Sequence, residues 1–346
     1  MYTDMGQQIL VTGLRTNAEY HLGNYLGALL PMVTMAREKA GEVQVNLFAP
    51  DLHSFTTPID HAQFYTQTMH NIKLFVAAGF PLDHADAHIY RQSRVPAHSE
   101  LTWILSNFTG FGEMSRMVEF KDKAAQLKED RVSVGLFSYP ILMASDILLY
   151  GAQWVPVGED QRQHLEFARD IAQRMNNQFG DLFVVPETIQ KQQEYVGRDD
   201  APRIRSLRDP SKKMSKSIDD PAGTIIMSDE PAAARKKIMS ATTDNVGVVN
   251  FDWEQQPGVT NLLQILALLS GRTQEDVNTE WTGASSYGSL KTAVADEVCA
   301  LLEKVQSTMA SIDNAEIEAK LHNSEKLMNE TANATLYKVQ KAIGLR

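Results

Sequence analysis

The chain has 346 residues, of which 43% are apolar and 22% are charged, and its formal net charge is −10. This composition excludes an intrinsically disordered chain, and the negative charge excludes a protein that coats nucleic acid non-specifically, since that mode needs a dominant positive field. The single cysteine, Cys299, excludes an internal disulfide and a cysteine metal site, and the length predicts two domains.

The longest apolar region, residues 132–157, is interrupted by Pro140, Asp146 and Gly151. The N-terminus lacks the basic segment and apolar core of a signal peptide. We therefore expect a cytoplasmic protein with no membrane partner.

The first half of the chain alternates short β-rich runs with helical patterns. This alternation is typical of parallel strands joined by crossover helices and predicts an α/β fold with a Rossmann-like, doubly wound parallel sheet. The expected strands are 8–12, 43–49, 87–90 and 154–157, and the expected helices are 25–39, 61–78, 139–150 and 159–176.

The composition changes after about Val196. Residues 197–223 are rich in Pro, Asp, Arg and Lys, so we expect a linker or mobile loop that cannot be buried. Helical spacing follows, for example at 261–269 and 289–304. The predicted organisation is a Rossmann-like domain at 1–196, the loop and linker at 197–223, and an all-helical domain at 224–346, whose last helix is a candidate to pack back on the first domain.

The sequence HLGN, His21 to Asn24, opens a helix after the first strand and a polar loop. Backbone amides at a helix N-terminus favour phosphate, and Gly23 lacks a side chain that would keep a nucleotide away. His21 and Asn24 lie one helical turn apart and can reach the same phosphate chain. Because a histidine at a helix start is more often a capping or surface residue, a second motif is needed.

The sequence KMSKS at 213–217 is that second motif. Its lysines and serines offer cationic and hydroxyl donors that can converge on phosphate oxygens. Together with HLGN it resembles the paired HIGH and KMSKS sequences of class I aminoacyl-tRNA synthetases. The resemblance implies a mobile loop that closes over the triphosphate of ATP and holds the leaving pyrophosphate. The catalytic residues that it implies are His21, Asn24, Lys213 and Lys216.

The run SYPILMASDILLYGAQWVPVGEDQ, which starts at Ser138, resembles the tryptophanyl-tRNA synthetase pattern, in which YP, LMA, DILLY and VPVGEDQ recur in that order. The resemblance extends through APDLHSFT, VPAH, RIRSLRDPSKKMSKS and PGVTNLLQILALLSG and covers most of the chain. Asp146 is set among apolar residues, and a buried carboxylate needs a donor. The resemblance implies that the indole N–H of tryptophan is this donor; a local backbone cap or an arginine partner is the alternative.

The resemblance also implies the remaining binding residues. Those for ATP are Arg15, Thr16, Asn17, Gly23, Asn24, Gly158, Glu159, Asp160, Ile204, Lys213, Met214, Ser215, Lys216 and Ser217. Those for tryptophan are His53, Tyr139, Met143, Asp146, Val155, Val157 and Gln161. Taken singly, each valine is better interpreted as core packing, and Asp160 has the alternative role of a helix cap.

The loop after the first strand departs from the family pattern. Thr16, Asn17 and Ala18 stand where Pro, Ser or Thr and then Gly are usual, and Arg15 stands where Gln or Lys is common. Arg15 can add a cationic contact to ATP, and Asn17 tolerates a left-handed backbone. Val11 occupies a position that is often aromatic.

The resemblance implies an ATP-dependent tryptophan–tRNA ligase. The tryptophan carboxylate attacks the α-phosphorus of ATP, pyrophosphate leaves, and the tryptophanyl group passes to the terminal ribose of tRNA(Trp). Mg²⁺ is expected on the phosphates, with no metal ligands on the protein. A homodimer with residues 108–120 near its interface is also implied, as is anticodon recognition by the helical domain. A tyrosyl-type synthetase and a non-catalytic, synthetase-like RNA-binding protein remain as alternatives.

Overall fold

The computed structural model of the chain describes residues 7–125, 132–158, 161–197, 202–215 and 220–346. The expectations for Glu159, Asp160, Lys216 and Ser217 lie outside these residues. The strands are β1 (Ile9–Gly13), β2 (Gln44–Ala49) and β3 (Ala87–Arg91). The helices are α1 (Leu22–Asn24), α2 (Leu30–Lys39), α3 (Asp51–Ser54), α4 (Phe64–Ala77), α5 (Ala97–Ser106), α6 (Phe111–Met114), α7 (Val118–Ala125), α8 (Val134–Leu148), α9 (Arg162–Phe179), α10 (Ile189–Val196), α11 (Pro231–Met239), α12 (Pro257–Ser270), α13 (Gln274–Trp281), α14 (Tyr287–Ser311) and α15 (Asn314–Ala342).

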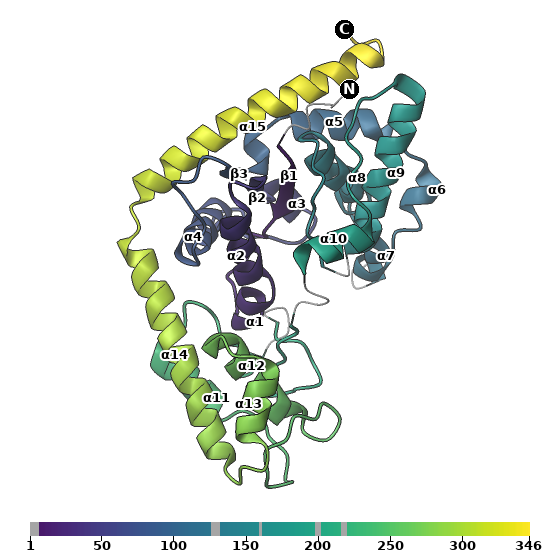
Figure 1. Cartoon of the computed structure of the whole chain (residues 1–346). Coiled ribbons are helices and arrows are strands. Elements are labelled where there is room, and N and C mark those ends of the chain that lie inside the picture. The colour runs from purple at the N-terminus through teal and green to yellow at the C-terminus, as the bar shows by residue number, and fades with distance from the viewer. Residues whose placement is uncertain (1–6, 126–131, 159–160, 198–201, 216–219) are drawn as a thin grey trace.

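The three strands form a parallel sheet in the order β1-β2-β3. Successive side chains of a strand point to opposite faces. Leu10 and Leu47 therefore join the apolar cluster that includes α2 and α4, whereas Val11 and Phe48 join the cluster that includes α5, α8 and α9. Helices thus cover both faces of the sheet. In Figure 1, α11 to α14 lie below the sheet, and α15 runs above it. Within the described ranges, no helix has the length and apolar character needed to cross a membrane.

The predicted strand at 154–157 is wrong beyond its first residue. Trp154 makes a single parallel bridge to Leu10, in which the backbone N–H of Val11 donates to the Trp154 carbonyl at 2.9 Å. The next N–H, that of Val155, donates to the side-chain oxygen of Gln192 at 2.9 Å, and Pro156 has no N–H to offer. A strand ladder therefore cannot continue.

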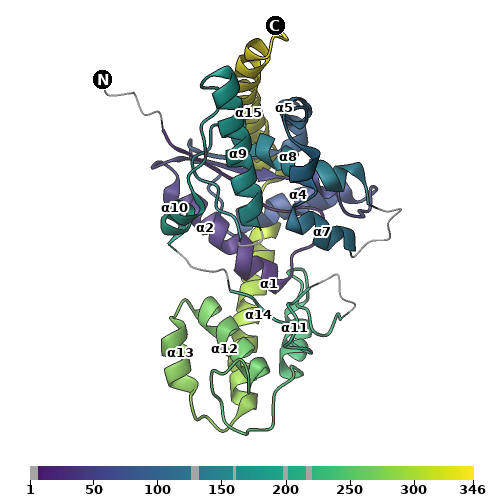
Figure 2. The same ribbon diagram turned by 90° about the vertical axis from the view of Figure 1, so that its right-hand side faces the viewer.

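The predicted helix at 25–39 is present in two parts. Residues Tyr25–Leu29 form a π-helical turn, in which the N–H of Leu30 donates to the Tyr25 carbonyl, and α2 follows. Pro31 explains the change, because it removes one donor of the α-helical ladder. The turn keeps α1 and the HLGN sequence below the sheet, facing α12 (Figure 2).

The last helix, α15, closes the free edge of the sheet. The backbone N–H of Ile89 on β3 donates to Ser324 Oγ at 3.3 Å, and that of Arg91 donates to Glu325 Oε1 at 3.3 Å. The Arg91 guanidinium also donates to both carboxylate oxygens of Glu325, at 2.6 and 3.0 Å. These bonds satisfy donors that an edge strand would otherwise expose.

The prediction that residues 197–223 cannot be buried is wrong at three apolar positions. Ile204, Leu207 and Met214 are 1%, 2% and 0% exposed. The N–H of Met214 donates to the Ile204 carbonyl at 3.0 Å, and that of Ser206 donates to the Lys212 carbonyl at 2.9 Å. We refer to residues 204–214 as the loop hairpin. Arg208, Lys212 and Lys213 are exposed, while the three apolar residues anchor the loop hairpin in the core.

Candidate active site

Polar side chains gather where β2 and β3 end. Asp51 on α3 follows β2, and its carboxylate accepts from Ser93 N–H at 2.8 Å and from Ser93 Oγ at 2.5 Å. Gln92 follows β3, and its Oε1 accepts from Leu52 N–H at 3.2 Å. The two strand ends are thus tied together at the carboxyl edge of the sheet, where doubly wound folds place ligands.

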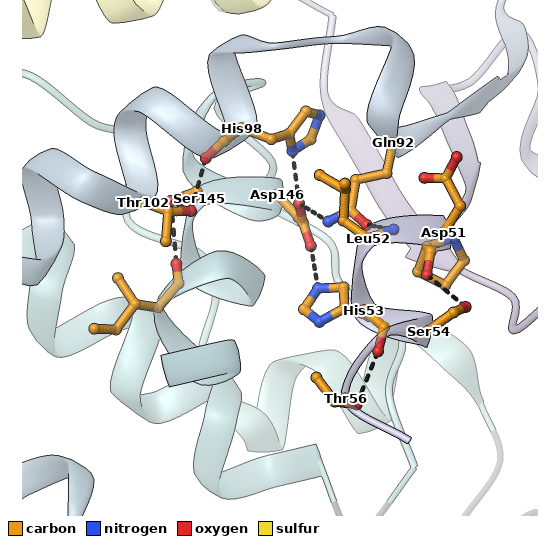
Figure 3. A network of polar contacts seen from close by, with 12 residues as sticks. Asp51, Leu52, His53, Ser54, Thr56, Gln92, His98, Thr102, Ser145 and Asp146 are labelled. Atoms are coloured by element: carbon orange, nitrogen blue, oxygen red, sulfur yellow. Dashed lines mark hydrogen bonds and ion pairs between the residues drawn. The ribbon is translucent and has the colours of Figure 1, made fainter. Parts of the chain in front are cut away.

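Asp146 on α8 lies beside this edge and is only 1% exposed. Its Oδ1 accepts from Gln92 Nε2 at 2.7 Å and from His98 Nδ1 at 2.6 Å, and its Oδ2 accepts from His53 Nε2 at 2.8 Å. Figure 3 shows Asp146 between His98 on one side and Gln92 and His53 on the other. The donors are therefore two imidazoles and an amide, and not the arginine that was one alternative.

The three donors keep the Asp146 carboxylate ionised. Burial alone would raise the pKa of Asp146, but the hydrogen bonds and charge of His53 and His98 outweigh it and lower the pKa. A carboxylate offers about four lone-pair sites. Among the described residues, two donors reach Oδ1 and one reaches Oδ2. By this count Oδ2 can accept from one further N–H.

The other residues expected at tryptophan lie in three places. Tyr139 lies near the network, with its ring 6.2 Å from the His53 ring at 79° and its hydroxyl 2.8 Å from His164 Nε2. Met143, Val155 and Val157 pack in the apolar cluster of the α8 face, in agreement with the core interpretation. Gln161 N–H donates to the Gly158 carbonyl at 2.9 Å at the start of α9.

The HLGN sequence has the geometry of a capped helix start. His21 is 5% exposed, and its Nδ1 accepts from the Asn24 N–H at 3.1 Å. A Cβ on Gly23 would lie 3.1 Å from that same Nδ1 and 3.4 Å from Ile204 Cβ, so a side chain there would crowd both residues. The capping interpretation therefore holds, and it orients the imidazole directly beside Gly23.

The two motifs meet at Ile204. A Cβ built on Gly23 would lie 3.4 Å from the Ile204 Cβ, and the Ile204 carbonyl accepts from the Met214 N–H of the KMSKS sequence. Beyond the loop, Leu22 N–H donates to the Ile225 carbonyl at 2.8 Å. Both flanks of the loop hairpin are thus fixed to HLGN, which the wide separation in sequence cannot reveal.

Lys213 is exposed next to the buried Met214 and lines a polar cavity of ≈ 370 Å³. The cavity is lined by Ser206, Arg208, Asp209, Lys212, Lys213, Ser215, Asp220 and Thr224. Hydrogen bonds from Ser211 and Lys212 lower the pKa of the exposed Asp209 carboxyl to about 2. A larger hollow of ≈ 470 Å³ lies on the surface of α9 and includes none of the expected site residues.

The loop at residues 16–18, which departs from the family pattern, is fixed by hydrogen bonds to Asn71 and Thr57. Asn71 Nδ2 donates to the carbonyls of Thr16 and Ala18, at 3.0 and 2.9 Å, and Thr16 is fully buried. Asn17 Nδ2 donates to Thr57 Oγ1 at 3.3 Å. None of the described non-glycine residues has a positive φ, so the left-handed geometry considered for Asn17 is not used. Arg15 is exposed, as a contact to ATP requires.

Three residues of the Asp146 network were missed from the sequence. Gln92 and His98 bind the carboxylate, and Tyr150 OH lies 2.8 Å from His98 Nε2. The VPAH motif contains His98, but nothing in its spacing indicates a partner in α8. Among the described residues, no group of three or more His, Cys, Asp or Glu side chains is arranged to hold a metal ion.

A family model described as tRNA synthetases class I (W and Y) matches residues 4–303. The chain belongs to this family. The synthetase is 41% identical to a tryptophan–tRNA ligase of Leifsonia xyli subsp. xyli, over 97% of this chain and 96% of that protein. It also resembles the crystal structure of tryptophanyl-tRNA synthetase from Mycoplasma pneumoniae, with a TM-score of 0.82, 32% identity and 98% of each chain covered.

A second solved structure, the tryptophanyl-tRNA synthetase from Campylobacter jejuni complexed with ADP and tryptophan, has a TM-score of 0.78 and 29% identity to the synthetase. The match covers 97% of this chain and 100% of the Campylobacter jejuni chain. The predicted family and the α/β class with an additional helical part are therefore confirmed.

Proposed function

We propose that the chain is a tryptophan–tRNA ligase that forms tryptophanyl-adenylate from tryptophan and ATP and transfers the amino acid to tRNA(Trp). The observation that carries the choice of tryptophan is the ionised, buried Asp146 with one acceptor site left on Oδ2. Indole offers one N–H donor and no acceptor, so it matches this site. A phenol can also donate, but its hydroxyl brings an oxygen that needs a partner of its own beside the buried Asp146.

In the adenylate step, the chain positions charge and supplies no covalent nucleophile. His53 and Tyr139 lie beside Asp146 and would line the indole site with Met143, while Gln161 lies at the start of α9. The proposed reaction requires the α-carboxylate of a tryptophan held there to meet the α-phosphorus of ATP bound at the HLGN helix start. Holding the two reactants in this geometry lowers the barrier by removing the entropy cost of their encounter.

We assign the phosphate contacts to His21, Asn24 and Lys213 and, outside the described residues, to Lys216. The exposed Lys213 lies at the edge of the polar cavity, so its ammonium can meet developing charge on the leaving pyrophosphate. The Ile204 backbone beside Gly23 would take the adenine, and Arg15, Asn17 and Gly158 the rest of the nucleotide.

Mg²⁺ fits this site as an ion carried by the phosphates. Asp209 already pairs with Lys212 at 2.9 Å, and Asp220 accepts from Ser206 Oγ at 2.8 Å, so these cavity carboxylates have partners on the protein. When bound, the ion would neutralise phosphate charge. The protein's own part is to place Lys213 on the same phosphates.

The proposal includes a homodimer that works in the cytoplasm and reads the anticodon with its helical part. Exposed apolar side chains on α5 to α8 support the dimer: Trp103, Phe111, Val118 and Val134 are 73%, 77%, 57% and 82% exposed. Two of them, Phe111 and Val118, fall within residues 108–120. Exposed apolar surface of this kind commonly marks an interface when it is contiguous.

Amino-acid-dependent exchange of labelled pyrophosphate into ATP tests the proposal, with tryptophan, tyrosine or no amino acid added. Exchange with tryptophan alone is the expected result. Exchange with tyrosine in its place would show a tyrosyl-type enzyme, and no exchange with either amino acid would leave a non-catalytic RNA-binding protein.

A further inference from the structure

We propose that Arg205 is a positioning residue for the release of pyrophosphate: clamped against Trp253, it sets where the loop hairpin presents Lys213. The inference rests on the proposed function. It concerns a side chain that is directed at the protein itself and not at ATP.

The Arg205 guanidinium is held between an aromatic ring and a carbonyl. Its Cζ lies 4.0 Å from the centroid of the Trp253 ring, and its Nη1 donates to the Pro210 carbonyl at 3.0 Å. Trp253 itself packs edge to face with Phe251 at 6.1 Å. A flat guanidinium suits this arrangement, because it can stack on the ring and donate in its own plane at the same time. Arg205 thus joins the turn of the loop hairpin to the segment before α12.

The backbone of Arg205 is fixed from the same side. Its N–H donates to Asn261 Oδ1 at 2.8 Å, and its carbonyl accepts from Asn261 Nδ2 at 3.1 Å. Directly across the loop hairpin, Arg205 forms an antiparallel bridge with Lys213. A displacement of Arg205 therefore moves the backbone of Lys213.

Neighbouring contacts leave the tip of the loop hairpin little room. Thr242 N–H donates to the Leu207 carbonyl, and Thr242 Oγ1 donates to the Arg208 carbonyl, both at 2.8 Å. At Gly258 a Cβ would lie 3.4 Å from Pro210 Cγ, so α12 begins directly against the tip. The base of the loop hairpin is anchored by Met214 and Ile204. The Arg205 side chain spans from the base of the loop hairpin to its tip at Pro210 and also reaches the helical part at Trp253.

Pyrophosphate exchange with separate KM and kcat values for ATP and tryptophan tests this role, with the active fraction set by tryptophan binding in calorimetry. We expect Arg205→Gln and Trp253→Leu each to lower kcat/KM for ATP about fivefold, the worth of one cation–π contact, and to leave the KM for tryptophan unchanged. The double variant should be no worse than either single variant, because both changes remove the same contact.

Two conservative variants and one matched control complete the test. Arg205→Lys and Trp253→Phe keep part of the contact, so their kcat/KM for ATP should lie between that of the wild type and those of Arg205→Gln and Trp253→Leu. They provide the test if Arg205→Gln or Trp253→Leu does not fold. Lys341→Met removes another cation–aromatic pair, Lys341 over Tyr337 on α15, and should behave as the wild type.

Three results would overturn the inference while the wild type exchanges normally: unchanged kcat/KM for ATP, an equal shift in the KM for tryptophan, or additive losses in the double variant. A wild type that shows no tryptophan-dependent exchange would instead overturn the proposed function, and the inference with it.

Discussion

Replacement of His98 by phenylalanine is a direct perturbation of the Asp146 network. His98 is fully buried, with Nδ1 2.6 Å from Asp146 Oδ1 and Nε2 2.8 Å from the Tyr150 hydroxyl. Phenylalanine is close to the ring in volume, so the change removes two hydrogen bonds and leaves the packing largely intact. Of the donors that the described residues offer, Asp146 then keeps Gln92 and His53.

The magnitude follows from these two bonds. A hydrogen bond to a charged group contributes about 1.5–3 kcal/mol, and a buried hydroxyl left without its partner costs about 1–3 kcal/mol. We therefore expect the free energy of unfolding to fall by about 3–5 kcal/mol, and the pKa of Asp146 to rise because a donor to its charged form is lost.

Urea unfolding at pH 7 measures this loss, and the KM for tryptophan measures its consequence at the site. Thr102→Val is a matched control on α5, since Thr102 donates to the His98 carbonyl and to Ser145 Oγ without touching Asp146. Two results together would refute this role of His98 in the Asp146 network. They are a loss of less than about 0.5 kcal/mol in the free energy of unfolding of His98→Phe, which is within the scatter of surface substitutions, and an unchanged KM for tryptophan.

Three further predictions concern the loop flank, the sheet and its edge. Gly223→Ala should lower the free energy of unfolding by about 1–3 kcal/mol by overpacking. The added Cβ would lie 1.9 Å from Asp220 Oδ2 and 2.3 Å from Ser206 Oγ. Thermal melts measure this loss of stability, with Gly288→Ala as the control, because there the atom nearest to the added Cβ is 3.7 Å away. Burial, with Lys320 nearby, lowers the pKa of His88 to about 4. The pKa of histidine in the unfolded chain is about 6.5, so His88 should contribute stability above pH 6.5. The free energy of unfolding should fall by roughly 2 kcal/mol as the pH is lowered from 6.5 toward 4. In urea unfolding, the free energy of His88→Gln should depend less on pH than that of the wild type, and an equal dependence would contradict the prediction. Glu325→Gln should lower the free energy of unfolding by about 1–3 kcal/mol, because it weakens the hydrogen bonds from the Arg91 guanidinium. In a double-mutant cycle with Arg91→Met, additive losses of free energy would show that the two residues do not act as a unit.

The sheet was predictable because its information is local. The runs at 8–12, 43–49 and 87–90 correspond to β1, β2 and β3 within one residue at each end, since apolar strands buried on both faces have a strong composition signal. Trp154 was predicted as a strand for the same reason, and the prediction failed because Pro156 and the Gln192 side chain remove the ladder there.

The site was predictable only where its residues belong to one short motif. HLGN and KMSKS indicate phosphate chemistry by residue type, but their meeting at Ile204 depends on chain folding over long distances. Asp146 could be identified because a carboxylate among apolar residues is costly. Its donors could not be identified, because Gln92, His98 and His53 come from three separate segments and only the tertiary structure brings them together.

We propose that Asp146 accepts the indole N–H of tryptophan. An analogue in which sulfur replaces that N–H, β-(benzothien-3-yl)alanine, keeps the shape of tryptophan and removes the donor. The most direct measurement is kcat/KM for pyrophosphate exchange with tryptophan and with this analogue. We expect a preference for tryptophan of at least about 10²-fold, because with the analogue the buried carboxylate would be left one donor short. Equal kcat/KM values for the two amino acids would contradict this role of Asp146.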